Sequence, residues 1–348
     1  MFFTAADYNF TSNIEFHRRI PAELGEDGDG AAKRRRALKL VDRALSKRQY
    51  KTALSLVKQL QGKPGGLRAF GAAKQITKGL SSVHEFELNG NNLLSLQPLV
   101  DSILDSIQQC TQISLLDEIS AEKLESLIAG SGHSSRYEEE HLICAEHEAG
   151  HFLVGYLLGV LPREYEVPSI QTLSQNRFAE GKVSFVGFEF LGEIDSFKIL
   201  SENADMRKFR NRAANNGRIS LKTLKQFSCV TLGGLVAELL VAGNSDGHLA
   251  DILKVSTPGQ LYVPLNSPFA FSTTSFLSHL HQLESVLRWL GLSKANADLH
   301  LKWAATNTVF VLSRHCETRS RLAEAMALGK PIGICIDTIE NCLQGREI

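Results

Sequence analysis

The chain has 348 residues, of which 43% are hydrophobic and 22% are charged, and its 38 basic residues balance its 38 acidic ones. This composition is that of a globular protein with room for one large domain or two smaller ones. A net charge of zero gives no reason to expect nucleic acid or an anionic membrane surface as the main partner. The basic run at residues 33–36 has no aromatic residue for base stacking, so we interpret it as the solvated start of a helix.

The cysteines and the apolar runs exclude two further classes. Six scattered cysteines without a CxxC pair argue against a disulfide-built secreted protein. The longest nearly apolar run, residues 152–161, is half of what a membrane-spanning helix needs. The N-terminus has no signal-peptide core, and its acidic residues argue against a simple transit peptide. We therefore expect an intracellular protein without a transmembrane segment.

The N-terminal part divides into a tail and a helical hairpin. Residues 1–32 end in the glycine- and acid-rich "GEDGDGAA", which is typical of a mobile tail. Residues 33–65 are predicted to form a helical hairpin, because two runs with apolar residues at helical spacing flank the polar "SKRQ". The hairpin resembles one tetratricopeptide-like unit, but a single unit cannot bury its own apolar face. We therefore expect it to dock on the rest of the chain.

A helical connecting region and a long helix are predicted next. Residues 66–134 form the connection, with leucine- and isoleucine-rich helices expected over 85–130. A capping box formed by Ser135 and Glu138 then opens a helix that runs to about Gly159.

The chain then changes from strand to helix periodicity. Residues 165–190 alternate as in a strand or the edge of a hairpin. A second long helix is predicted over 221–242, with Gly243 as a left-handed cap. A short helix is expected near Asp246, and residues 283–348 again indicate helices.

The first long helix contains the motif "HEAGH" at residues 147–151. One helical turn separates His147 from His151, so both imidazoles can hold one zinc ion from the same face. Glu148 lies beside them and can accept a proton from water that the metal activates. The competing interpretation is a buried helix that merely contains histidines. Burial favours the metal, because two histidines and a glutamate are costly to desolvate without partners.

A third protein ligand is expected from the second long helix or just after it. Glu238 and Asp251 are the two candidates there. Gly233 and Gly234 lie inside this helix, where each costs roughly 1 kcal/mol relative to alanine. We expect these glycines to let a neighbouring helix approach closely.

The two motifs together resemble the protease domain of the FtsH-type ATP-dependent zinc metalloproteases. The resemblance covers about residues 137–253 and depends on "AEHEAGH", "GGLVAELLVAG" and "GHLAD". It implies a mainly α fold, with a helical zinc-metalloprotease domain over 135–348, a small β element and the hairpin before it. It also implies one Zn²⁺ ion with three ligands, His147, His151 and Asp251, and Glu148 as general base. Glu238 is then expected either to support a ligand or to have a structural role, with the ligand role left as its alternative.

The chain also departs from that family. It has no G-x-x-x-x-G-K-[ST] motif, so we expect that it does not bind ATP. It is most similar to the plant FtsH-like proteins that lack the ATPase, several of which are associated with plastids. The resemblance thus implies a plastid location, with the cytoplasm as the alternative, and an ATP-dependent protease or ATPase acting in trans as a partner.

Three functional hypotheses follow. The first is a zinc metalloendopeptidase that acts on unfolded or loosened polypeptides. The second is a catalytically weak zinc-binding scaffold or partner of a membrane-bound ATP-dependent protease, with peripheral membrane association left open. The third is a helical interaction protein without a metal. The intact Glu148 favours the enzyme, because a scaffold does not need a general base.

Residues 255–281 interrupt the C-terminal helical region. Pro258, Pro264 and Pro268 argue against a helix through most of this segment, and its composition has no clear period. An irregular loop of this length is uncommon inside a compact domain. Two explanations stay open: a surface loop over the predicted cleft, or a segment translated from a retained intron.

Overall fold

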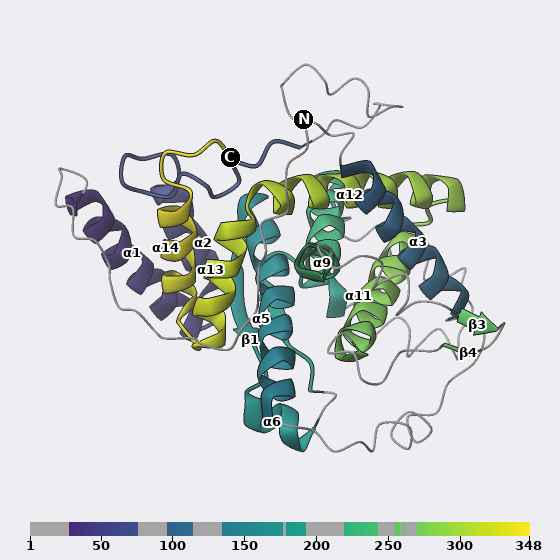
Figure 1. Ribbon diagram of the computed structural model, residues 1–348. Helices are drawn as coiled ribbons and strands as arrows, with labels where there is room; N and C mark the ends of the chain where they lie inside the picture. Colours follow the sequence, from purple (N-terminus) through teal and green to yellow (C-terminus); the bar gives the residue numbers. More distant parts are fainter. Residues whose placement is uncertain are drawn as a thin grey trace, which may run out of the picture.

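Two long helices, α5 (Ser134–Leu157) and α9 (Leu221–Ala242), pack against each other at the centre of the computed structural model (Figure 1). Both correspond to the predicted long helices, and the chain turns at Gly159 with a φ of 81° just after α5. The structure describes residues 28–75, 96–113, 134–176, 179–192, 219–242, 255–257, 260–261 and 270–348.

Glycines bring the backbones of α5 and α9 into contact. A Cβ atom on Gly150 would lie 2.3 Å from the carbonyl oxygen of Gly233. Conversely, a Cβ atom on Gly233 would lie 2.8 Å from the carbonyl oxygen of Gly150. Neither position has room for a larger side chain. The predicted close approach of a neighbouring helix at the glycine pair is therefore confirmed.

The remaining helices of the larger part surround this pair. Helices α11 (Ala270–Trp289) and α12 (Lys294–Arg314) pack on α9, and α13 (Cys316–Ala327) packs on α5. Helix α3 (Gln97–Ile113) lies against α12, within the predicted connecting region. These elements confirm the mainly α fold class and the helical prediction for residues 283–348.

The predicted hairpin is present as α1 (Gly28–Ser46) and α2 (Tyr50–Leu60). Helix α14 (Ile332–Cys342) packs against α1 and connects the hairpin to the rest of the chain (Figure 1). The buried Arg34 guanidinium lies 2.7 Å from the Asp337 carboxylate. The backbone N–H of Gly333 donates to Asp42 at 2.7 Å. The hairpin is therefore docked, as expected, and its apolar side chains belong to one continuous core with α5, α9 and α12.

The start of α1 differs from the prediction. The helix begins at Gly28, inside the range assigned to the tail, and continues through Ala31 and Ala32. Alanine is the best helix former, which explains how the helix extends beyond the basic run. The rest of the predicted tail lies outside the described residues, as do 76–95 and 114–133 of the connecting region.

A small antiparallel sheet follows α5. Strand β1 (Pro162–Glu166) pairs with β2 (Lys182–Phe185). Strand β2 confirms a strand within the alternating segment, whereas β1 begins three residues before that segment. Between the strands lies α6 (Ile170–Gln175), a short helix that the alternation did not predict. The Ser169 side chain accepts a hydrogen bond from the Thr172 backbone N–H and caps this helix.

The segment 255–281 is more regular than expected. Strand β3 (Val255–Thr257) pairs with β4 (Gln260–Leu261), and helix α11 begins at Ala270. The prediction of an irregular insert is therefore wrong over residues 270–281. The last proline of the segment is Pro268, and α11 itself contains no proline or glycine that would interrupt it. The cap at Gly243 and the short helix near Asp246 lie outside the described residues.

Within the described residues, one helical stretch has the length and hydropathy of a membrane span. It is Leu221–Val241 of α9, and 83% of the tested window is buried inside the protein. The core helix of a protein that never enters a membrane can satisfy the same criterion. The finding is therefore weak evidence for a membrane-spanning segment.

Candidate metal centre

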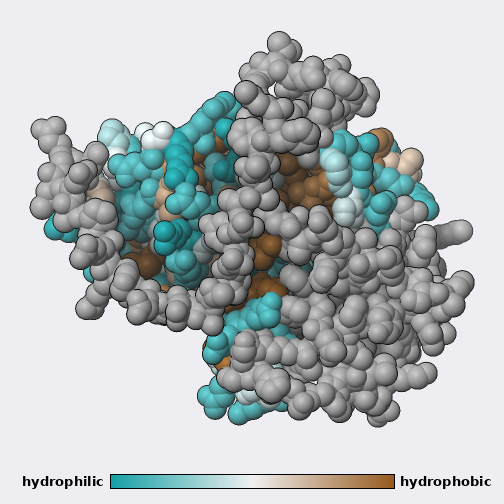
Figure 2. Space-filling view, in the orientation of Figure 1, coloured by the Kyte–Doolittle hydropathy of each residue, from teal (hydrophilic) through white to brown (hydrophobic). Residues whose placement is uncertain are grey.

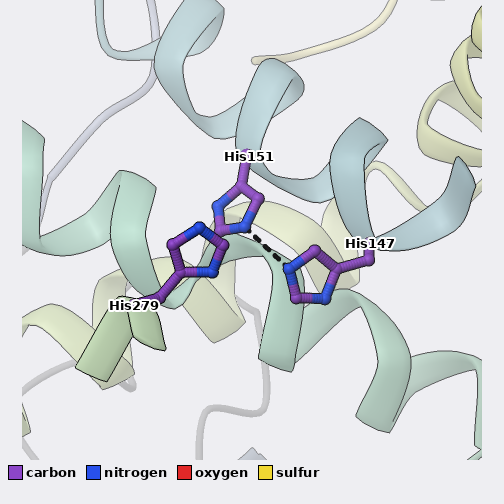
Figure 3. A group of neighbouring side chains, drawn as sticks. All are labelled: His147, His151 and His279. Atoms are coloured by element: carbon purple, nitrogen blue, oxygen red, sulfur yellow. Dashed lines mark hydrogen bonds between the residues drawn. The ribbon is translucent and has the colours of Figure 1, made fainter. Parts of the chain in front are cut away.

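Two histidines of α5 lie one helical turn apart with both rings against α9. His147 and His151 are 3% and 4% exposed, and their Nε2 atoms are 2.9 Å apart (Figure 3). The i, i+4 spacing on one helix face predicts this placement.

The other nitrogen of each ring is held by a hydrogen bond. Nδ1 of His151 donates to the Val230 carbonyl oxygen at 2.6 Å, because a carbonyl can only accept. Nδ1 of His147 contacts the carboxyl group of Glu238. The two Nε2 atoms lie within hydrogen-bond distance of each other, and the ring that carries its hydrogen on Nε2 is the donor. When both rings carry their hydrogens on Nδ1 instead, both Nε2 lone pairs can bind one cation, so the pair also fits a shared metal ion.

A glycine of α9 makes room for the His147 ring. A Cβ atom on Gly234 would lie 2.3 Å from Nε2 of His147. The two glycines of the pair therefore have different roles. Gly234 leaves space for the His147 side chain, whereas Gly233 contacts the backbone of α5. Any larger residue at position 234 would displace the imidazole.

A third histidine, His279 of α11, completes the group (Figure 3). Its ring centroid lies 4.6 Å from that of His151 and 5.6 Å from that of His147. One nitrogen from each of the three rings lies within 4.8 Å of the others, close enough to hold a metal ion. Nδ1 of His279 is buried and has no hydrogen-bond partner.

The sequence analysis missed His279, because it treated residues 255–281 as irregular. A signal was available after Pro268. Leu280, Leu283 and Leu287 recur at helical spacing, and all three are buried in α11. His279 lies four residues before the buried Leu283, so the two side chains share one side of the helix.

Glu148 is a buried carboxyl group that lacks a partner. It is 1% exposed, and neither of its side-chain oxygens has a hydrogen-bond partner. Gly181, next to β2, leaves space for it, since a Cβ atom there would lie 2.6 Å from Oε1. An unsatisfied buried carboxyl group is costly unless water, a proton or a cation interacts with it.

Burial favours the uncharged forms of all these groups in the absence of a metal. It lowers the pKa of His147 to about 4 and that of His151 to about 3, so both imidazoles are neutral near neutral pH. Burial, followed by the charges of Glu238 and Glu180, raises the pKa of the Glu148 carboxyl. Neutral imidazoles are the form that binds a metal, and a nearby cation would favour ionisation of Glu148.

The predicted site residues fall into two groups. The structure brings together His147, Glu148, His151 and Glu238, and it places Glu238 behind His147. Asp251, the third ligand that the resemblance implies, lies outside the described residues. Among the described residues, the group that could hold a metal ion consists of three histidines, His147, His151 and His279.

The comparisons with known proteins add no relative. No protein-family model, curated protein or solved structure matches the chain.

Proposed function

We propose that this protein is a zinc metalloendopeptidase that cleaves unfolded or loosened polypeptides. One observation carries the proposal: two buried histidines bring their Nε2 atoms within 2.9 Å of each other, beside a buried carboxyl group without a partner. The H-E-x-x-H order of these residues is the arrangement of zinc peptidases that use glutamate as general base. The resemblance to the FtsH-type protease domain supports the same chemistry.

Each side chain of the candidate centre has a separate role in the proposed reaction. When bound, zinc supplies Lewis acidity, which polarises a carbonyl group and makes water a stronger acid. His147 and His151 would hold the ion, and the Glu238 contact at Nδ1 would keep the His147 ring oriented. Glu148 takes a proton from water and passes it to the leaving amine of the substrate.

The third zinc ligand has two candidates. His279 is supported by its distance from the other two histidines and by its unpartnered Nδ1. Asp251 is supported by the resemblance alone. Zinc in a catalytic site usually has three protein ligands and one open position, so one of the two residues suffices.

The proposal includes no nucleotide chemistry in this chain, because no phosphate-binding loop motif is present. A peptidase without an unfolding motor fits substrates that are already unfolded, or that an ATPase in trans delivers. The resemblance supports a plastid location, with the cytoplasm as the alternative.

The Glu148→Gln variant tests the enzyme. Gln has nearly the same size, so the fold and the zinc content should stay at wild-type values. It cannot take the proton, and a placed general base is typically worth ~10²–10⁴ in rate. We expect casein hydrolysis to fall by that factor, and added ATP to change neither protein. Equal, background-level cleavage by zinc-loaded wild type and variant would favour the scaffold hypothesis instead.

Metal competition titrations decide the ligand set. His147→Ala should empty the site whichever third ligand is used, and zinc retained by this variant would remove the metal proposal altogether. His279→Ala and Asp251→Ala are then compared at equal protein stability. A loss of orders of magnitude in zinc affinity for only one of them identifies the third ligand.

A further inference from the structure

Charge is strongly segregated in this neutral chain. The hairpin, residues 28–60, contains ten lysines and arginines but only two acidic residues, Asp29 and Asp42. Asp42 is partly buried and accepts a hydrogen bond from the Gly333 backbone N–H in α14. The excess positive charge of the hairpin is therefore not neutralised by acidic residues of the hairpin itself.

From Arg35 onwards, six of these ten basic residues are exposed on α1 or on the turn after it. We define the basic face as the exposed side chains of α1 and of the turn after it: Arg35, Arg36, Lys39, Arg43, Lys47 and Arg48. Spacings of three and four residues align Arg36, Lys39 and Arg43 along the helix. Within the part of the chain that the structure describes, none of the six side chains forms an ion pair. The opposite side of α1 is buried against α2 and α14.

The basic face has one apolar side chain in its middle. Leu40 is 48% exposed between Lys39 and Arg43. The nearest aromatic residue in sequence, Tyr50, is partly buried and has the Arg163 guanidinium 5.3 Å from its ring centroid. The face therefore offers no free ring for base stacking, which disfavours single-stranded nucleic acid.

We propose that the basic face of α1 binds an anionic phospholipid surface. A membrane requires neither a groove nor a specific shape, and one convex helix face with long basic side chains around a leucine matches a flat charged interface. Each lysine or arginine near such a surface strengthens binding by roughly fivefold. We expect the six exposed basic residues of this face to give measurable binding at low salt.

Binding through α1 would not cover the helices of the candidate metal centre. Helix α1 lies on one side of α5 and α11, which carries His279, on the other (Figure 1). The surface over α1, α13 and α14 in the face drawn in Figure 2 is largely hydrophilic, without a broad apolar patch. Electrostatic attraction, rather than insertion of an apolar surface, should therefore dominate. The proposal does not depend on the peptidase or on zinc.

Vesicle co-flotation of the full chain tests this inference. One vesicle contains equal parts of phosphatidylglycerol and phosphatidylcholine, and the other contains phosphatidylcholine alone. The wild type should float with the anionic vesicle only, and binding should weaken as salt shortens the range of the charges. The triple variant R36E/K39E/R43E should bind on the order of 100-fold more weakly, since three attractive charges are lost and reversed.

A matched control separates the basic face from net charge. K222E/K294E/K302E reverses three exposed lysines of α9 and α12, so it has the same net charge as the triple variant of α1. This control should keep most of the binding. Equal losses in both variants, or no binding of folded wild type to the anionic vesicle at low salt, would overturn the proposal. Tighter binding to an oligonucleotide than to the vesicle would overturn it in favour of nucleic acid.

Discussion

Two residues of α9 fix the imidazoles of α5 from behind. The Glu238 carboxyl group contacts Nδ1 of His147, and the Val230 carbonyl accepts from Nδ1 of His151. Such contacts hold the ring orientation, and a donating Nδ1 is the tautomer that leaves Nε2 available for a metal. Of the two, only the Glu238 contact uses a side chain, so only that contact can be removed by substitution.

Glu238→Gln should weaken zinc binding by about 10–100-fold while the protein stays folded. Burial raises the pKa of the Glu238 carboxyl, and a bound cation would favour its ionised form. The amide keeps the size of the side chain but cannot supply the carboxylate that would then strengthen the Nδ1 hydrogen bond. A competition titration against a chromophoric chelator measures the affinity. Glu140→Gln, a buried carboxyl group two turns before His147 on α5, is the control and should keep wild-type affinity. Unchanged affinity in folded Glu238→Gln would contradict the supporting role.

At the scale of elements, the site depends on how closely α5 and α9 approach. The backbone contact between Gly150 and Gly233 brings the helix with both histidines to the helix that carries Glu238. Phe185 of β2 similarly occupies the space beside Gly155, where a Cβ atom would lie 2.3 Å from the Phe185 ring. Small residues on α5 thus let two separate elements pack closely on it.

Gly150→Ala should destabilise the protein by about 1–3 kcal/mol, as overpacking typically does. Alanine is the better helix former by up to ~1 kcal/mol, but its Cβ would lie 2.3 Å from a carbonyl oxygen of α9 that cannot move alone. Urea denaturation measures the change. Gly192→Ala is the control, because nothing lies within 4 Å of a Cβ atom there. If Gly150→Ala were as stable as the control, the backbone contact would not limit the packing.

At the scale of the whole molecule, one buried carboxylate joins three distant segments. Glu340 of α14 accepts from the backbone N–H groups of Arg68 and Ala69, both at 2.9 Å. It also accepts from the Tyr156 hydroxyl at 2.6 Å. The chain after the hairpin, the end of α5 and α14 are thereby linked, and the hairpin shares their core. We therefore expect the hairpin and the metal-centre helices to stabilise each other.

Glu340→Ala should destabilise the protein by at least ~3 kcal/mol, because it leaves buried donors from two segments without an acceptor. Glu324→Ala removes an exposed carboxylate of α13 and should change stability by no more than about 0.5 kcal/mol. Urea denaturation of both variants checks this. A loss for Glu340→Ala as small as that of the control would show that the link contributes little.

The sequence by itself determined the local features. Apolar periodicity located the hairpin, the two long helices and most of the C-terminal helices, because each signal lies within one element. The spacing of His147 and His151 placed both rings on one face, since i and i+4 neighbours meet on any α-helix. The glycine pair also indicated a close helix contact, although it did not identify the partner residue.

Only the tertiary structure decided which distant residues meet. His279 joins the two histidines of α5 because α11 packs beside α9, and no local period encodes that contact. The contact of Glu238 with His147 likewise depends on the register between α5 and α9, which Gly150 and Gly233 determine across 83 positions of the chain. Spacing within a helix is fixed by backbone geometry, whereas contacts between helices depend on side-chain packing that forms only when the chain folds.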